Sequence, residues 1–436
     1  MKQQKVILIL HHPPTTLFPL YKSGITPENC NEHYYSCEWE NIGKYPHWVG
    51  FFRGDHHELW AKMLKKEFPN LLIECWRPYS SIIDRVYSKD VDGITHKIFP
   101  SHAFSRLRKW FKAWMCSPLM VRELKKEKEK YNVLIHIVDG HSDFSNYLVN
   151  RMFKESIPVV ISQGSDSYSK QSYLSFEWYR QLYHYNYLIN AYFQEKALHR
   201  TSYLFSASVR ECAFLRKKLP WFSGYEHYVG TIDYEYFKND ESQDVIGLKR
   251  KYKIKDKLRV ILFVGRFNSI TDMKDLVDSW YSDRDLKAQT QLVCIGGYNT
   301  DEYYKYAQER EVVLIPRSKT DVLKEVYTIT DVAVYPIFDK TLVNMGGFGI
   351  SNAECLAFGI PLVSNNLIHF PGKIEERNSL GVLMPNREAM ITGIKHILDN
   401  PEYYTHCREI SRKYFDNGVL AKKYHDKYKE LFQNYY

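Results

Sequence analysis

The alternation of short apolar runs with segments of helix length limits the fold of this chain more than any other feature. Runs rich in valine, isoleucine and leucine recur through both halves, and longer stretches of mixed polarity separate them. Apolar strands without polar alternation are typical of parallel sheets, which helices cover on both faces. The sequence therefore predicts two successive doubly wound α/β units. The runs lie at 5–10, 132–140, 157–164, 202–208, 259–267, 291–297, 312–318, 331–337, 360–366 and 381–385.

The length of 436 residues favours two domains rather than one. A polar and charged stretch at 235–257 separates the two sets of apolar runs, and it predicts a linker followed by a surface helix. We therefore expect a first domain at 1–237, a second domain at 238–414 and a final helical segment at 415–436.

Composition restricts the compartment and the partners. The eight cysteines include no CxxC pair, and several lie in apolar runs, which favours free thiols in a reducing compartment. The first apolar run is shorter than a signal peptide requires and no segment is long enough to span a bilayer, so we expect a cytoplasmic protein. The net charge of +9 weakly favours anionic partners, whether a nucleotide, a phospholipid or a nucleic acid.

Residues at the carboxyl ends of the predicted strands are the first candidates for a binding site, because parallel sheets bind ligands there. In the first half these are Asp139, His141 and Gln163. In the second half Gly265 ends a strand and Arg266 follows it. A guanidinium at a strand tip can form paired hydrogen bonds to an oxygen-rich anion such as a diphosphate. An interdomain salt bridge is the alternative role for Arg266.

The segment 344–364, "NMGGFGISNAECLAFGIPLVS", predicts a glycine-rich turn, a helix from about Ile350 and a short strand. The free N–H groups and positive dipole end of such a helix favour an anion. Glu354 lies about two helical turns beyond Gly347, so it can face the same ligand and accept hydrogen bonds from a ribose diol. The spacing does not fit a dinucleotide fingerprint. Close packing of helix and strand is the alternative explanation.

Together these segments resemble the nucleotide-sugar domain of GT-B glycosyltransferases, specifically the retaining family 4 group. The match to the donor-binding segment of that group is "GGFGISNAECLAFGIPLVS", and three further stretches are similar to its motifs: "IPVVISQGSD" (157–166), "YVGTIDYEYF" (228–237) and "ITDVAVYPI" (329–337). The resemblance covers about residues 130–436. It implies a GT-B fold: two Rossmann-like domains facing a cleft, with the acceptor bound by the first domain, the donor by the second, and a C-terminal helix crossing back to the first.

The resemblance also implies a retaining transfer of a sugar from a nucleotide-diphosphate donor, without metal or cofactor. Side chains at one strand tip hold the diphosphate, backbone amides hold the donor sugar, a glutamate holds the ribose, and a later strand end meets the base. The implied catalytic residues are Arg266, Lys274 and Gln163, the donor-binding residues are Gly265, Arg317, Ser318, Gly347, Phe348, Gly349 and Glu354, and the acceptor side is formed by Asp139 and His141.

Three departures from the family pattern concern function rather than fold. Thr271 stands where the family has a lysine, with Lys274 one helical turn later; Gln163 replaces a histidine, and Gly347 replaces the first glutamate of a pair. A front-side retaining mechanism depends mainly on stabilising the departing diphosphate, so we expect an active enzyme. The competing interpretation is a GT-B scaffold that has lost catalysis and assists an active partner. Modification of a nucleic-acid base, a third class, has no supporting motif.

The segment 106–115, "RLRKWFKAWM", predicts an amphipathic helix with tryptophans on one side and basic residues on the other. Such a helix suits the surface of an anionic membrane, which would imply a lipid-linked acceptor. A surface helix that buries its aromatic side in the first domain is the alternative. The DxD at 90–92 precedes a strand-like run and is interpreted as a charged turn, so no metal site is expected.

Overall fold

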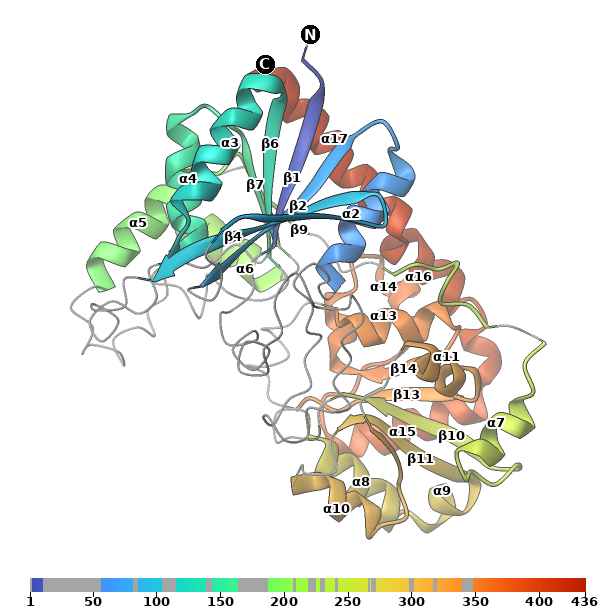
Figure 1. The fold of residues 1–436 in the computed structure, drawn as a ribbon. Helices are drawn as coiled ribbons and strands as arrows, with labels where there is room; N and C mark the ends of the chain where they lie inside the picture. Colours follow the sequence, from blue (N-terminus) through green and yellow to red (C-terminus); the bar gives the residue numbers. More distant parts are fainter. Residues whose placement is uncertain are drawn as a thin grey trace. The chain divides into compact units, whose positions relative to one another are not determined.

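The computed structural model describes residues 2–10, 56–80, 85–103, 115–138, 143–163, 187–206, 209–218, 225–227, 232–239, 242–265, 267, 272–297, 302–316, 320–338 and 348–436. The chain divides into two compact units (Figure 1). The first comprises Met1–Ser206, Arg210–His227 and Ala421–Tyr436, and the second comprises Ala207–Val209 and Tyr228–Leu420. The boundary expected from the sequence follows residue 237.

The first unit is built on one sheet with the strand order β3-β4-β2-β1-β6-β7-β8-β9, and β5 pairs with β4. All neighbours on this path are parallel except β3, which pairs antiparallel with β4. The strands are β1 (Gln4–Leu10), β2 (Leu72–Ser80), β3 (Tyr87–Val91), β4 (Ile94–Ala103), β5 (Met115–Cys116), β6 (Asn132–Val138), β7 (Val159–Gln163), β8 (Tyr203–Ser206) and β9 (Tyr225–His227).

Helices pack on both faces of this sheet, as the unbroken apolar strands require. Ile7 and Ile135 lie on the face that forms a buried cluster with α3 (Pro118–Lys130), α4 (Asp143–Lys154) and α5 (Tyr187–Arg200). Successive strand residues point to opposite faces, so His136 belongs to the other face. Aromatic residues of α2 (His56–Glu67) and α17 (Asn417–Tyr435) surround His136, and α6 (Val209–Lys218) completes the unit.

The second unit has a parallel sheet with the order β12-β11-β10-β13-β14-β15. Its strands are β10 (Arg259–Val264), β11 (Thr290–Gly297), β12 (Val313–Pro316), β13 (Val332–Tyr335), β14 (Leu362–Ser364) and β15 (Gly381–Val382). Its helices are α7 (Val245–Lys251), α8 (Met273–Ser282), α9 (Arg284–Gln289), α10 (Glu302–Gln308), α11 (Thr320–Thr328), α13 (Ile350–Ala357), η5 (Asn365–His369), α14 (Ile374–Asn378), α15 (Arg387–Asp399), η6 (Pro401–Tyr404) and α16 (Cys407–Phe415).

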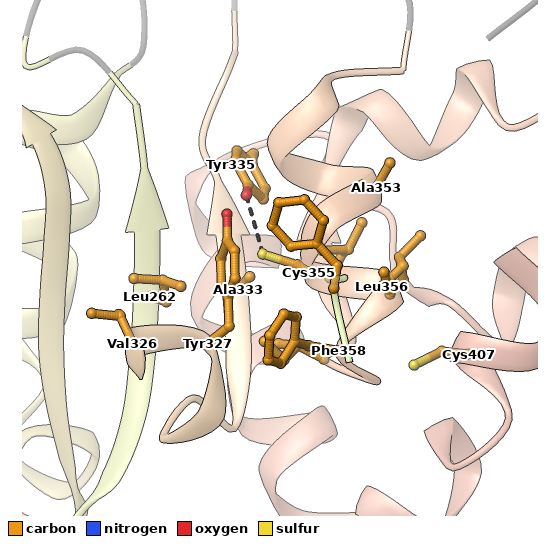
Figure 2. Packing of buried hydrophobic residues seen from close by; sticks show 14 of the residues in the cluster. Leu262, Val326, Tyr327, Ala333, Tyr335, Ala353, Cys355, Leu356, Phe358 and Cys407 are labelled. Atoms are coloured by element: carbon orange, nitrogen blue, oxygen red, sulfur yellow. Dashed lines mark hydrogen bonds between the residues drawn. The ribbon is translucent and has the colours of Figure 1, made fainter. Parts of the chain in front are cut away.

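Two buried clusters lie on the two faces of the second sheet. Leu262 and Ala333 contribute to a cluster with α11, α13 and α16, part of which Figure 2 shows. Ile261 and Val332, their neighbours in sequence, belong to a second cluster with α8, α10 and α15. Successive residues of each strand therefore point alternately into the two clusters. Both faces of the strands are buried, which explains why their sequences are continuous apolar runs.

Two expectations concern local features of the described residues. The DxD at 90–92 lies in the β3–β4 hairpin, where Asp92 and Gly93 have φ of 53° and 75° and form a two-residue turn. Within the described ranges, no helix is both long and apolar enough to cross a membrane.

Candidate functional site

The ends of β10 and β11 are held together by glycines that leave no room for a side chain. Gly296 has a φ of +115°, and a Cβ there would lie 2.7 Å from the carbonyl oxygen of Gly265. Gly265 in turn donates its backbone N–H to Ile295 at 3.0 Å. The two strand ends therefore approach each other more closely than residues with side chains could. Arg266 follows Gly265 directly but lies outside the described residues.

The N-terminus of α13 is open to a ligand at its first turn. Its N-cap residue is Gly349, which has no side chain to cap the helix, and the first turn contains no acidic residue. The first N–H groups of a helix have no partner within the helix, so they and the dipole favour an anion. Phe348 anchors the preceding residue, since its ring is buried and stacks on Phe415 with centroids 4.7 Å apart.

Glu354 lies in α13 and is held by a tyrosine of another helix. The Tyr327 hydroxyl of α11 donates a hydrogen bond of 2.7 Å to Glu354 Oε2. Burial raises the pKa of the Glu354 carboxyl to about 7, and the Tyr327 hydrogen bond opposes this by stabilising the ionised form. A carboxyl with such a pKa changes charge near neutral pH, which is typical of functional sites.

A second buried tyrosine lies beside this pair without bonding to the carboxylate. The Tyr335 hydroxyl of β13 is 3.3 Å from Cys355 Sγ, the contact drawn in Figure 2. Burial raises the pKa of both Tyr327 and Tyr335 well above the ordinary value, so both hydroxyls remain protonated at neutral pH.

Asp272, which no sequence motif indicates, connects α8 to the segment that follows β13. It is the N-cap residue of α8 with a left-handed φ of 45°, and its Oδ2 accepts a hydrogen bond of 2.7 Å from the Phe338 backbone N–H. A non-glycine residue in that region is strained by about 1 kcal/mol or more. Nothing in the sequence signals the strain, although aspartate before a helix is a common N-cap.

Lys274, predicted to contact the diphosphate, lies in the first turn of α8. Its side chain is exposed, and its Nζ lies 5.0 Å from the centre of the Tyr306 ring. The two side chains therefore form a cation–π contact between α8 and α10. A role of Lys274 in catalysis stays a prediction.

Most of the other predicted site residues fall on segments that the structure does not describe. Gln163 is the last residue of β7 and pairs with Ser206 of β8, but its side chain is outside the described residues. Gly265, Phe348, Gly349 and Glu354 are described above. The residues outside the described ranges are Asp139, His141, Arg266, Thr271, Arg317, Ser318 and Gly347, together with most of the predicted amphipathic helix at 106–115.

Arg77, in β2 of the first unit, is a polar residue that sequence reasoning missed. Its side chain is 2% exposed, and within the described part of the chain its Nε and Nη2 have no hydrogen-bond partner. Guanidinium nitrogens that are buried without a hydrogen-bond partner are costly. A lone arginine in a strand gives no signal in one sequence. The described residues contain no group of three or more His, Cys, Asp or Glu side chains that could hold a metal ion.

Comparisons with known proteins agree with this architecture. Residues 246–414, within the second unit, match the family model for Glycosyl transferases group 1. An uncharacterized glycosyltransferase of Methanocaldococcus jannaschii is 25% identical over 179 residues, which are 40% of this chain and 44% of that protein. The chain therefore aligns with less than half the length of this curated relative.

Two solved structures resemble the whole chain at low sequence identity. Sucrose-phosphate synthase from Thermosynechococcus elongatus is 16% identical with a TM-score of 0.63, and the match covers 99% of this chain and 100% of that one. HepE of Anabaena in complex with UDP is 12% identical with a TM-score of 0.61, covering 97% and 99% of the two chains. At these identities the likeness shows the fold, and the predicted class of two Rossmann-like units in a GT-B fold is confirmed.

Proposed function

We propose that this protein is a retaining glycosyltransferase that moves a sugar from a nucleotide-diphosphate donor to a glycan or glycolipid. The family model matched by residues 246–414 and the GT-B fold together support a glycosyltransferase. The observation that carries the proposal is that match, in a unit where the open N-terminus of α13 lies one helical turn before Glu354. HepE, which has the same fold, was solved with UDP, and this supports a nucleotide-sugar donor.

On this proposal the second unit binds the donor. The N–H groups at the start of α13 donate to the donor sugar or its phosphate, and Glu354 accepts hydrogen bonds from the ribose hydroxyls. Arg266 binds the diphosphate with the help of Lys274, and Arg317 and Ser318 meet the base. The close approach of the β10 and β11 ends at Gly265 and Gly296 supports this arrangement, because it lets backbone rather than side chains line the strand tips.

The reaction is mainly one of positioning and electrostatics. The bond from the acceptor hydroxyl oxygen to the anomeric carbon forms on the same face on which the bond from that carbon to the diphosphate breaks, and the hydroxyl proton passes to the departing diphosphate oxygen. Fixed amides, Arg266 and a helix terminus stabilise the charge that develops on the diphosphate. Neither a covalent intermediate nor a metal ion is part of the proposal. Gln163, His141 and Asp139 line the acceptor side, and the segment 106–115 contacts an anionic membrane if the acceptor is lipid-linked.

A catalytically degenerate scaffold is the second candidate function, and specific residues favour it. Gln163, Thr271 and Gly347 stand where the resembled family has a histidine, a lysine and a glutamate. Loss of the lysine alone removes about a few kcal/mol of leaving-group stabilisation unless Lys274 substitutes for it.

A donor screen separates the two functions. Nucleotide release from UDP- and GDP-sugars is followed with the parent protein and with Arg266→Ala, alongside calorimetry with the same donors. We expect binding and turnover by the parent and about 100-fold slower turnover by the variant. No nucleotide binding at millimolar concentrations would support the scaffold, and equal turnover in the two proteins would refute the role of Arg266.

A further inference from the structure

Tyr327 is fixed so that its hydroxyl reaches Glu354. The residue is 1% exposed, and its ring packs between Phe237 and Phe358, with centroids 6.5 and 5.2 Å away. Side chains in close-packed interiors sit in rotamer minima. The position of the Tyr327 ring, and with it that of the hydroxyl, is therefore set by the core of the second unit, part of which Figure 2 shows.

The hydrogen bond occupies only one of the two carboxylate oxygens. Tyr327 donates to Oε2 of Glu354, so this bond does not use the second oxygen, Oε1. Glu354 as a residue is only partly buried, and its Oε2 is held by the Tyr327 hydroxyl. A carboxylate in this state is oriented but retains accepting capacity for a ligand.

We propose that Tyr327 is a positioning residue for the nucleotide-sugar donor, whose hydroxyl orients the Glu354 carboxylate and keeps it ionised for bonding to the ribose. This inference rests on the proposed function. It adds a residue of α11, an element outside the glycine-rich segment 344–364, to the donor site. The hydroxyl should also have an effect that packing alone would not have: a hydrogen bond to the charged form of a carboxyl lowers the pKa of that carboxyl.

The titratable groups near Glu354 do not change charge in the pH range where Glu354 does. Among the described residues, Tyr327 of α11, Tyr335 of β13 and Cys355 of α13 itself interact with Glu354, and Cys407 of α16 lies next to Cys355. Burial raises the pKa of each of these tyrosines and thiols, and that of Cys407 reaches about 12. All four are therefore neutral near pH 7, where Glu354 changes charge.

Donor binding should therefore weaken as the pH falls through about 7, because the protonated carboxyl is a poorer acceptor for the ribose hydroxyls. Removing the Tyr327 hydroxyl should move the midpoint of this dependence upward by about one pH unit. At pH 7 the variant should bind donor about fivefold more weakly.

The experiment measures the dissociation constant of UDP-glucose or GDP-mannose, whichever the parent binds, from pH 5.5 to 8.5 by calorimetry. These donors suit the test because a diphosphate esterified at both ends does not titrate in this range. Tyr327→Phe is compared with Tyr335→Phe, a matched control that removes a buried hydroxyl of the same cluster that contacts Cys355 and not the carboxylate. Glu354→Gln should give a flat profile.

An upward shift of the midpoint in Tyr327→Phe, with none in Tyr335→Phe, supports the inference. Equal midpoints in both variants and the parent would overturn it, even if Tyr327→Phe were less stable, because a packing role does not move a titration. A parent profile that Glu354→Gln leaves unchanged would overturn it as well. If the parent binds neither donor, the proposed function itself fails and the inference fails with it.

Discussion

At the scale of single residues, the raised pKa of Glu354 has a consequence for stability. Its carboxyl has a pKa of about 7 in the folded protein against an ordinary value of 4.5. Folding therefore favours the protonated form, and this contribution is complete below about pH 4 and is lost as the pH rises through 7. Above pH 7 the partly buried carboxylate costs up to roughly 3 kcal/mol, since each tenfold factor is about 1.4 kcal/mol.

Glu354→Gln should therefore stabilise the protein at pH 8 by about 1–3 kcal/mol, while the two proteins should be nearly equal at pH 5. Glutamine keeps an oxygen that can accept from Tyr327 and carries no charge to bury. Urea unfolding of both proteins at the two pH values measures the difference. A variant that is less stable than the parent at pH 8 would contradict the raised pKa.

The crowding at Gly296 can be tested by substitution, with Gly359 as the control. Gly296→Ala places a Cβ 2.7 Å from the Gly265 carbonyl oxygen at a φ of +115°, whereas Gly359 has a φ of +81° with nothing within 4 Å of a Cβ. Gly359→Ala should cost about 1 kcal/mol from its backbone alone. Gly296→Ala should cost about 2–4 kcal/mol, because crowding adds to strain. Equal losses in thermal unfolding would mean that the strand ends relax freely.

At the scale of elements, buried charges join β1, β2 and β4 to α3 in the first unit. Lys5 Nζ lies 2.6 Å from both Glu74 Oε1 and Glu127 Oε2, and Lys97 lies within 3.4 Å of the same two carboxylates. Burial alone would lower the pKa of Lys5, but the hydrogen bonds to Glu127 and Glu74 outweigh it and raise the pKa. Burial alone would raise the pKa of Glu127, but the hydrogen bonds and charges of Lys5 and Lys97 outweigh it and lower that pKa.

Lys5→Met should destabilise the protein by about 3–5 kcal/mol at pH 7, because among the described residues only Lys97 then remains to pair with the two buried carboxylates. The loss should shrink as the pH falls from 4.5 through the lowered pKa of Glu127, because the stability that this carboxylate contributes above 4.5 disappears as it becomes protonated in the folded protein. Lys125→Met is the control: Lys125 pairs with Glu155 at 2.5 Å but is 49% exposed, so it should cost less than about 1 kcal/mol. Equal losses would contradict the buried network.

At the scale of the whole molecule, the last helix returns the chain to its first unit. Residues Ala421–Tyr436 belong to that unit, and Tyr428 bonds through its hydroxyl to His136 Nδ1, 292 residues away in sequence. Tyr436 also donates to the Val133 carbonyl oxygen at 3.0 Å. Burial lowers the pKa of His136 to about 3, so the ring is neutral and its hydrogen bond is between neutral groups.

Tyr428→Phe should cost about 1–3 kcal/mol, because it leaves a buried ring nitrogen without its partner. Tyr435→Phe on the same helix removes a hydroxyl that lies 3.0 Å from Ser202 Oγ at an exposed position, so it should change stability by less than about 0.5 kcal/mol. Denaturant unfolding of the two variants gives the comparison. A Tyr428→Phe protein as stable as the control would mean that packing alone holds the helix.

The elements differ in how far the sequence could predict them. The runs at 259–267 and 360–366 became β10 and β14, because strands buried on both faces need apolar residues throughout. The segment from Gly349 to Ala357 became α13 with its glycine N-cap, as its small residues and the preceding glycines suggested. Asp272 and Arg77 were missed, because strain and burial without a partner arise from packing and leave no pattern in one sequence.

The sequence by itself determined the fold class, because the order and polarity of its runs leave a doubly wound α/β arrangement as the way to bury them. It also pointed to Glu354, through a local pattern around the glycine-rich turn. Only the tertiary structure decided the pKa of the Glu354 carboxyl and its hydrogen-bond partner. That pKa depends on burial and on the hydrogen bond from Tyr327. Tyr327 lies in α11, 27 residues earlier in the chain, and the surrounding core fixes its position. Electrostatics depends on distances in space, and those exist only once the chain has folded.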